Sequence, residues 1–474
     1  MAAHFPLEIQ QHVFQYLDPR SFNASRAVCR WWRHASTDPV TLATQLQQVP
    51  ITPSVSAKTL GSERLLSLFG EAAHTLMLGM RVTTPGSRSP LFTEKSIQAK
   101  LSISKNQKRA AALSDREITL WNLEAAQPEV ISRRALNDLR TAIGGGPWFK
   151  CAPTTLYELA LSDDGTLLAI ALERTIQIYD LSAEEDSWPS SAYIPSAAGH
   201  YIAGLAFQHN NSLLRVQLSN KGTVVYLGSP QDSTPSLQHW QGKGGLRHAF
   251  LDSSKVVPRP FTTIPLSDAL AGMKLLRPLN DGWLFAAQRR HPIAPSSCYC
   301  VGYIATPTMH GHFATAENSA VILADLPSPF SFSPTSRTRH GYWEDLYSEF
   351  TRQPDFSLSA DGILLAMSAD CSANSYERDD SNVAVYRLPR SEQLAAKLDQ
   401  ESCSDLKQKE QHRVQSSSEH QVHTISRLPM SLGTIKGRLL GFRFEESSSA
   451  SGGRSYQLCA TTETGSRHWS LLDS

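Results

Sequence analysis

Arginine pairs are the residues of this chain whose type and spacing best suit recognition chemistry. A guanidinium offers two parallel N–H groups to a phosphate or a carboxylate, so arginines on the loops of a scaffold can hold a phosphorylated or acidic segment. The candidate positions for binding such a target are Arg133, Arg134, Arg289, Arg290, Arg337 and Arg339. The alternative is an ordinary solvated surface, because the sequence does not show whether these side chains converge.

No motif for catalysis accompanies these arginines. The sequence contains no Gly-x-Ser-x-Gly elbow, no Gly-x4-Gly-Lys-Ser/Thr phosphate loop and no His-Glu-x-x-His pair. The glycines at 144–146 follow a helix-like stretch and precede a proline, which predicts a helix end and a turn. A phosphate cradle would instead follow a strand and open a helix. We therefore expect a protein that is not an enzyme and carries no cofactor.

Two cysteine and histidine pairs raise the hypothesis of a metal site. Cys298 and Cys300 are separated by one residue, and His310 and His312 follow them. A structural zinc site needs four converging ligands and commonly has two to four residues between its cysteines. On a strand, both cysteines would share one face, which the core of a sheet explains equally well. We therefore expect no metal.

Composition narrows the class of protein. The 474 residues carry a formal net charge of +1, whereas a broad grip on nucleic acid needs a clustered excess of Lys and Arg. No apolar run approaches the roughly 18 residues of a membrane span, and the first residues lack a signal-peptide pattern. Seven cysteines, an odd and sparse number, predict reduced thiols. We expect a protein of the cytoplasm, the nucleus or both, with no membrane or nucleic-acid partner.

Helical patterning is confined to the first part of the chain. Ile9, Val13 and Leu17 recur every four residues and mark the apolar stripe of a short helix. Asp-Pro steps predict two further helix starts, because Asp caps an N-terminus and Pro fits the first turn. We expect three helices, through 9–17, 19–34 and 39–46, and a further helical stretch at 63–69. Helices this short bury little surface, so an apolar patch should remain for a partner.

A repeat of strand, polar turn, strand, short turn and strand dominates the rest of the chain. The step from Ser104 to Trp121 is 17 residues, as is the step from Ser162 to Tyr179. Further copies are expected at 205–227 and 356–388, with weaker ones at 273–304, 439–471 and 247–264. Antiparallel units of about 45–60 residues predict a β-propeller of six or seven blades, in which neighbouring blades cover each other's edges.

The N-terminal segment resembles an F-box. The family pattern is Leu-Pro-x-Glu-Ile, a Leu-Asp helix break, and Val-Cys-Arg-x-Trp-Arg in the following helix. The matching residues are Phe5-Pro6-Leu7-Glu8-Ile9, Leu17-Asp18-Pro19, Val28-Cys29-Arg30-Trp31-Trp32-Arg33 and Asp38-Pro39. The chain departs from the pattern at Phe5, where leucine is usual, and no tryptophan follows Asp38-Pro39.

The resemblance implies a partner for these helices. In that family, the F-box binds a Skp-family adaptor, which links it to a cullin scaffold, and the rest of the chain selects a target for ubiquitination. The residues that the resemblance divides between the adaptor interface and the domain's own core are Phe5, Pro6, Ile9, Val13, Leu17, Val28 and Trp32. The alternative is that the helices only pack on the propeller.

The repeat region is similar to WD-repeat propellers. The residues at the position of a blade's Trp-Asp pair are Trp121-Asn122-Leu123, Tyr179-Asp180-Leu181 and Tyr386-Arg387-Leu388. Ser162–Gly165 and Ser359–Gly362 match the polar turn of such a blade, which we place between its second and third strands. The usual Gly-His pair is not evident in register.

Together these features predict a multidomain protein. We expect an all-α three-helix F-box at 1–50, a linker with a short helix at 51–73 and an all-β propeller with WD-like blades at 74–474. The stretch at about 389–421, rich in Gln, Ser, Lys and Glu, predicts a disordered insertion. The predicted function is the substrate-recognition subunit of a Skp-cullin-F-box ubiquitin ligase with an unidentified protein target. The alternatives are an F-box–adaptor scaffold outside any ligase, and a propeller with a catalytic or small-molecule-binding face.

Overall fold

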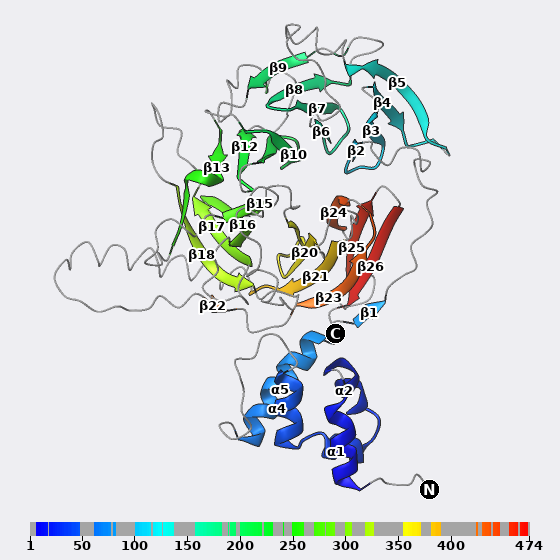
Figure 1. The fold of residues 1–474 in the computed structure, drawn as a ribbon, viewed down its shortest axis with the longest axis vertical. Helices are drawn as coiled ribbons and strands as arrows, with labels where there is room; N and C mark the ends of the chain where they lie inside the picture. Colours follow the sequence, from blue (N-terminus) through cyan, green and yellow to red (C-terminus); the bar gives the residue numbers. More distant parts are fainter. Residues whose placement is uncertain are drawn as a thin grey trace, which may run out of the picture.

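A computed structural model of the chain has a helical unit followed by a ring of six sheets (Figure 1). The residues that the structure describes are 6–17, 19–47, 61–76, 79–81, 100–114, 117–125, 127–136, 157–182, 188, 190–195, 200–219, 222–230, 240, 249–259, 270–279, 281–289, 299–305, 318–326, 354–370, 381–389, 423–424, 429–437, 439–445, 455–462 and 465–472. Apart from Pro389, the insertion expected at 389–421 lies outside them. Within these ranges, no helix combines the length and the apolar composition needed to cross a membrane.

Five described helices form the N-terminal unit. They are α1 (Leu7–Gln15), α2 (Pro19–Ser25), α3 (Arg30–Ala35), α4 (Pro39–Gln47) and α5 (Ser62–Leu76). The start expected at 38–39 is present, because the Oδ2 atom of Asp38 accepts the backbone N–H of Thr41 at 2.8 Å. This bond satisfies one of the amide groups that a helix N-terminus leaves without an intrahelical partner.

The prediction of a single helix over 19–34 is wrong, because the structure has two helices, α2 and α3, in this range. Cys29 lies between them in an extended conformation, with φ −159° and ψ 169°. Its Sγ atom accepts the N–H of Trp32 at 3.5 Å and so caps α3. The Ser25 hydroxyl donates to the carbonyl of Phe22 at 2.6 Å, a local bond that competes with helix continuation. The apolar spacing runs through this break and therefore did not reveal it.

The core of the helical unit draws on α5 as well as on the first four helices. Phe14 of α1 and Phe22 of α2 pack edge to face at 5.3 Å, and Phe22 packs in the same way on Phe69 of α5 at 5.0 Å. Leu65 of α5 is also fully buried in this cluster. The helical stretch expected at 63–69 is thus part of a longer helix that completes the core. The domain boundaries at 50 and 73 stay predictions.

The first three sheets are four-stranded and antiparallel, and each is one blade. Blade 1 is β2 (Lys100–Ile103), β3 (Arg109–Ser114), β4 (Glu117–Asn122) and β5 (Glu129–Ala135). Blade 2 is β6 (Tyr157–Leu161), β7 (Leu167–Leu172), β8 (Thr175–Asp180) and β9 (Ser190–Pro195). Blade 3 is β10 (Ile202–Gln208), β11 (Leu213–Leu218), β12 (Val224–Gly228) and β13 (Leu251–Asp252).

Three more blades complete the ring. Blade 4 is β15 (Leu270–Leu279), β16 (Gly282–Arg289), β17 (Tyr299–Ala305) and β18 (Asn318–Leu326), with β14 (Val256–Arg259) and β22 (His423–Thr424) parallel to β18. Blade 5 is β19 (Asp355–Leu358), β20 (Leu364–Asp370), β21 (Ser381–Arg387) and β23 (Met430–Ile435). Blade 6 is β24 (Leu439–Glu445), β25 (Ser455–Thr462), β26 (Gly465–Leu472) and β1 (Gly79–Arg81).

The propeller has six blades, the lower of the two expected numbers. The weak repeat expected at 247–264 does not form a blade in the described residues of that range. Its strands divide between neighbours instead, because β13 completes blade 3 and β14 pairs with β18 of blade 4. A two-residue strand followed by a parallel edge strand cannot make a sheet of its own.

The ring is closed by a strand from the N-terminal side of the chain. Strand β1 pairs antiparallel with β26, so that Gly79 lies opposite Leu472. Helix α5 ends at Leu76, and two residues separate it from the start of β1 at Gly79. The helical unit is therefore joined directly to the blade that contains both ends of the propeller sequence.

Repeated polar turns set the geometry of the blades. In blade 2 the Ser162 hydroxyl donates to Asp164 at 2.6 Å and accepts the N–H of Leu167 at 2.8 Å. Ser359 makes the equivalent bonds in blade 5, at 2.7 and 2.9 Å. These turns join the first and second strands, so placing them between the second and third was wrong. The leucine after the Trp-Asp position then closes each hairpin, as Leu181 does by donating to the carbonyl of Thr166 at 2.7 Å.

Candidate functional site

One side of helix α1 exposes large apolar residues. Ile9, Val13 and Tyr16 are 50%, 47% and 77% exposed, and their spacing of four and three residues puts them on one side of the helix, named here the α1 face. The opposite side buries Gln10 and Phe14. An amphipathic helix ordinarily turns its apolar stripe to the core, so apolar residues on the outer side of α1 indicate a docking surface.

The residues expected at an adaptor interface divide between the surface and the core. Pro6, just before α1, and Val28, between α2 and α3, are exposed together with Ile9 and Val13. Leu17 and Trp32 are partly buried and pack against the core of the helical unit. Phe5 lies outside the described residues.

Sequence reasoning did not place Tyr16 among the adaptor-binding residues. Its position seven residues after Ile9, which is two helical turns, was the signal that could have identified it. Its ring packs edge to face on His12 at 5.1 Å, so it is held near the end of α1 while it remains largely exposed.

A buried glutamine holds the end of the α1 face in place. The Nε2 atom of Gln45, on α4, donates to the carbonyls of Phe14 at 2.7 Å and Leu17 at 2.9 Å. Phe14 belongs to the last turn of α1, and Leu17 lies two residues after the end of that helix. The bonds therefore fix α1 against α4 and orient its outer side.

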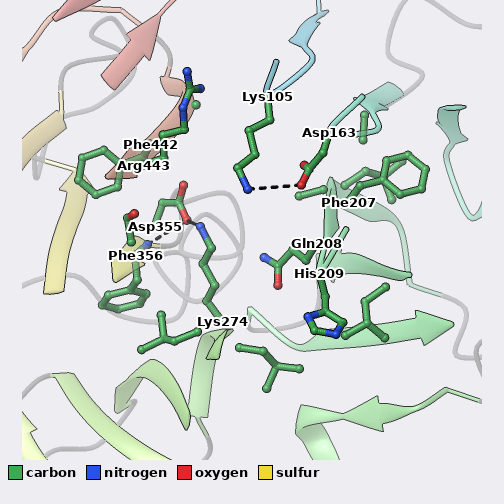
Figure 2. A pocket seen from close by; sticks show the side chains of 18 of the residues that line it. Lys105, Asp163, Phe207, Gln208, His209, Lys274, Asp355, Phe356, Phe442 and Arg443 are labelled. Atoms are coloured by element: carbon green, nitrogen blue, oxygen red, sulfur yellow. Dashed lines mark hydrogen bonds and ion pairs between the residues drawn. The ribbon is translucent and has the colours of Figure 1, made fainter. Parts of the chain in front are cut away.

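The second candidate site is the channel at the centre of the propeller. A cavity of about 360 Å³ is lined by the first strand of every blade, namely β2, β6, β10, β15, β19 and β24. Figure 2 shows charged side chains from different blades pointing into it. The fold itself creates this site, because only a closed ring brings six strands so distant in sequence to one axis.

Ion pairs across neighbouring blades dominate the channel. Lys105 of blade 1 pairs with Asp163 of blade 2 at 3.5 Å, and Lys274 of blade 4 pairs with Asp355 of blade 5 at 2.6 Å (Figure 2). Arg443 of blade 6 also lines the cavity. Such groups can bind the charged and polar side chains of a protein segment.

The serines of the channel serve the scaffold. The Ser102 hydroxyl of blade 1 accepts the N–H of Leu161 in blade 2 at 2.9 Å, and Ser357 of blade 5 accepts the N–H of Phe444 in blade 6 at 3.0 Å. His209 packs edge to face on Trp283 at 4.9 Å. Among the described lining residues we find no serine–histidine pair that could serve as nucleophile and base.

The three described arginines among those expected to bind a target lie on two separate blades. Arg133 and Arg134 lie on β5 of blade 1, whereas Arg289 lies on β16 of blade 4. Arg133 is largely exposed and sits 3.9 Å from Glu117, and Arg134 packs over the ring of Trp188 at 5.9 Å. Arg290, Arg337 and Arg339 lie outside the described residues.

Arg289, one of the arginines expected to bind a target, is buried in blade 4. Its side chain is 8% exposed and pairs with Asp325 at 2.8 Å within blade 4. Burial of an arginine requires such a partner, since an isolated charge away from water is strongly destabilising. This pair is therefore part of the packing of the blade.

The cysteines and histidines considered for a metal give no described cluster in blade 4. Cys300 is buried on β17. Cys298, His310 and His312 lie outside the described residues.

A family model described as F-box-like matches residues 2–47 of the chain. The protein carries an N-terminal F-box-like domain. The exposed α1 face is thus the outer side of the first helix of the F-box-like domain, and the six-bladed propeller follows it. A comparison with curated proteins gives no match.

A comparison with solved structures gives matches of low sequence identity. The Cps50 (Swd1) β-propeller domain of Myceliophteria thermophila has 10% sequence identity and a TM-score of 0.33, over 83% of this chain and 99% of that one. A chain of the yeast Nup82–Nup159–Nup116 nucleoporin complex has 8% identity and a TM-score of 0.35, over 81% and 98%. The propeller assignment of the present chain rests on the strand order of its six sheets.

Proposed function

We propose that this protein is the substrate-recognition subunit of a Skp-cullin-F-box ubiquitin ligase. The F-box-like domain binds a Skp-family adaptor, which connects it to a cullin, and the propeller binds a target protein. The protein itself is not catalytic and acts in the cytoplasm, the nucleus or both. The observation that carries this proposal is the apolar α1 face on a domain that matches the F-box-like family.

The α1 face suits an adaptor interface in its chemistry. Interfaces between proteins concentrate their binding energy in a few central apolar or aromatic side chains that become fully desolvated. Ile9, Val13 and Tyr16 supply such side chains on a helix whose position is fixed by the buried core behind it. A pre-ordered surface of this kind loses little conformational entropy on binding.

The contribution to ubiquitination would be proximity. A target held by the propeller is presented at a high effective concentration to the conjugating enzyme at the other end of the complex. The direct connection from α5 to β1 favours this role, because it leaves few residues between the adaptor-binding domain and the ring. We place target binding at the charged channel, with Lys105, Lys274 and Arg443 as its cationic contacts.

The test is a pull-down of the full-length chain with a Skp-family adaptor and a cullin. We compare the wild type with the double variant Ile9→Asp and Val13→Asp, which puts two carboxylates on the α1 face. The matched control is Val40→Asp, because Val40 is 56% exposed on α4 and lies outside the α1 face. Circular dichroism of all three proteins verifies that the helices are retained.

The expected result is capture of adaptor and cullin by the wild type and by Val40→Asp, and of neither by the double variant. Capture of the adaptor without the cullin would favour a scaffold outside a ligase. Failure of the wild type to capture the adaptor would overturn the proposal.

A further inference from the structure

A cysteine, a histidine and a glutamate gather on one side of blade 6, and the proposed function uses none of them. One ligand atom from each of Glu445, Cys459 and His468 lies within 4.8 Å of the other two. The Sγ atom of Cys459 is 3.8 Å from Nε2 of His468, and Nδ1 of His468 is 3.7 Å from Oε2 of Glu445. Cys459 is 1% exposed, whereas the side chain of His468 is 39% exposed.

The sheet register explains why these groups meet. Arg443 on β24, Cys459 on β25 and His468 on β26 are successive cross-strand partners. Glu445 follows Arg443 by two residues and so shares its side of the sheet. The three groups are therefore held by hydrogen-bonded neighbouring strands, the kind of rigid support on which precise sites are built.

This side of blade 6 is polar, unlike the opposite one. Leu458, Ala460 and Trp469 alternate with Cys459 and His468 along the strands and pack against blade 5. The side with the cysteine turns toward blade 1, where the buried apolar residues of the described cluster are Leu101, Ala110 and Ala112. Four partly buried apolar residues pack against them, among them Leu440 of β24. The three groups thus lie at the junction between the last blade and the first.

We propose that Glu445, Cys459 and His468 bind a zinc ion. A thiolate, an imidazole and a carboxylate are all ordinary zinc ligands, whereas magnesium and calcium take oxygen ligands. Around a tetrahedral zinc ion the ligand atoms lie about 3.3–3.6 Å apart, given metal–ligand bonds of about 2.0–2.3 Å. In blade 6 one ligand atom from each residue lies within 4.8 Å of the others, and the shorter distances involve different nitrogens of His468. The partly exposed side chains of His468 and Glu445 must therefore turn to bring one imidazole nitrogen and one carboxylate oxygen to the same ion as the Cys459 sulfur.

Neighbouring groups support such a site. Arg443 donates to Oε1 of Glu445 at 3.3 Å, which leaves Oε2 directed at His468. The Thr461 hydroxyl lies 3.8 Å from the Cys459 sulfur. Partners of this kind orient the direct ligands of a metal. The exposed side of His468 provides a route for the ion and a fourth position for water.

The same three residues in this order also resemble a nucleophile, a base and an orienting acid. One observation decides against that interpretation. Cys459 is almost completely buried, so a substrate could not reach its sulfur. A bound zinc ion would displace the thiol proton to solvent and stabilise the thiolate.

Cobalt(II) is the probe for this site, because a Co²⁺–thiolate bond gives a charge-transfer absorption band that Zn²⁺ lacks. The full-length chain is freed of metal with a chelator and titrated with Co²⁺ and then with Zn²⁺. The variants are Cys459→Ser and His468→Gln. The matched control is Cys300→Ser, which removes another buried cysteine, in blade 4.

We expect one Co²⁺ per wild-type chain, with a charge-transfer band that Zn²⁺ abolishes and that Cys300→Ser retains. Cys459→Ser should lose the band, and His468→Gln should bind at least about tenfold more weakly. The proposal is overturned if the wild type shows no band, or if Cys459→Ser keeps it because other cysteines bind the metal.

A thermal readout covers the case in which Cys459→Ser does not fold. Zinc should raise the Tm of the wild type but not that of His468→Gln. The side chain at position 468 is partly exposed, so this variant is expected to fold. An equal rise in both proteins would overturn the proposal. Because the site lies in the propeller, none of these results depends on adaptor binding by the F-box-like domain.

Discussion

The F-box-like domain and the propeller differ in where their large apolar side chains lie. Among the described residues, the exposed ones in the helical domain are Ile9, Val13, Tyr16, Val28 and Val40. In the much longer propeller they are Val130, Ile131 and Tyr201. A ring of blades buries both sides of most sheets against neighbours, whereas five short helices enclose one small core and leave apolar side chains outside it.

This difference suits the two regions to two kinds of partner. An apolar surface on a pre-ordered helix fits one constant partner, because its affinity comes from burial and needs little charge complementarity. The channel of the propeller offers paired charges, which discriminate between targets more than they add affinity. The helical domain is thus suited to the proposed adaptor and the propeller to a selected target.

The largest expected loss of stability comes from a substitution in the core of the helical domain that leaves the propeller folded. Phe22→Ala removes a fully buried ring that contacts Phe14 and Phe69, so we expect about 3–5 kcal/mol of destabilisation of the helical domain. Adaptor capture should be lost while the strand signal in circular dichroism persists. Normal adaptor capture by this variant would contradict the packing described for the domain.

The reverse experiment weakens the propeller alone. Arg289→Met leaves the Asp325 carboxylate in blade 4 without its ion-pair partner, and we expect a loss of about 3 kcal/mol in a denaturant titration. Arg133→Met is the control, because Arg133 is exposed and should change stability by less than about 0.5 kcal/mol. Equal effects of the two substitutions would show that Arg289 is not a structural residue.

A smaller effect is expected where the core orients the α1 face. Gln45→Leu removes the donor to the carbonyls of Phe14 and Leu17 and should destabilise the helical domain by about 2 kcal/mol. The affinity of this variant for the adaptor should also fall. Surface plasmon resonance measures this affinity at a temperature at which the helical domain stays folded. An unchanged affinity would mean that the end of α1 lies outside the interface.

Substitution of an exposed tyrosine in each region compares their surfaces directly. Tyr16→Ser should weaken adaptor binding by about 1–2 kcal/mol, with thermal stability nearly unchanged. Tyr201→Ser, in the propeller, should leave adaptor binding unchanged. Equal losses of affinity in both variants would remove the distinction between the two surfaces.

Low pH should destabilise the propeller by protonating an aspartate in one of its polar turns, Asp164. Burial raises the pKa of Asp164, but hydrogen bonds from Ser162 and Thr166 outweigh it and hold that pKa below its ordinary value. The ionised carboxylate therefore adds stability above the ordinary aspartate pKa of about 3.9, and this is lost as the pH falls through the lowered value. Asp164→Asn should make the propeller less sensitive to pH in that acidic range. The opposite trend would contradict the described bonds.

Several features of the fold could be predicted because they are encoded locally. The Ser-x-Asp-Gly turns at 162–165 and 359–362 can be recognised in the sequence, because they are formed by side-chain hydrogen bonds between residues close in the chain. Helical spacing placed Ile9 and Val13 on one side of α1, but it did not show that this side is exposed. The break at Cys29 escaped prediction because an apolar pattern of helical period continues through it.

Local patterns were enough to predict short helices followed by a series of strand–turn–strand units, because periodicity, caps and turns act over a few residues. The F-box resemblance came from a short motif in those helices. Which distant residues meet depends on the tertiary structure. It placed β1 beside β26, buried Arg289 against Asp325, and brought Glu445, Cys459 and His468 together across three strands. Each of these depends on strand register and ring closure, which no local pattern of residues specifies.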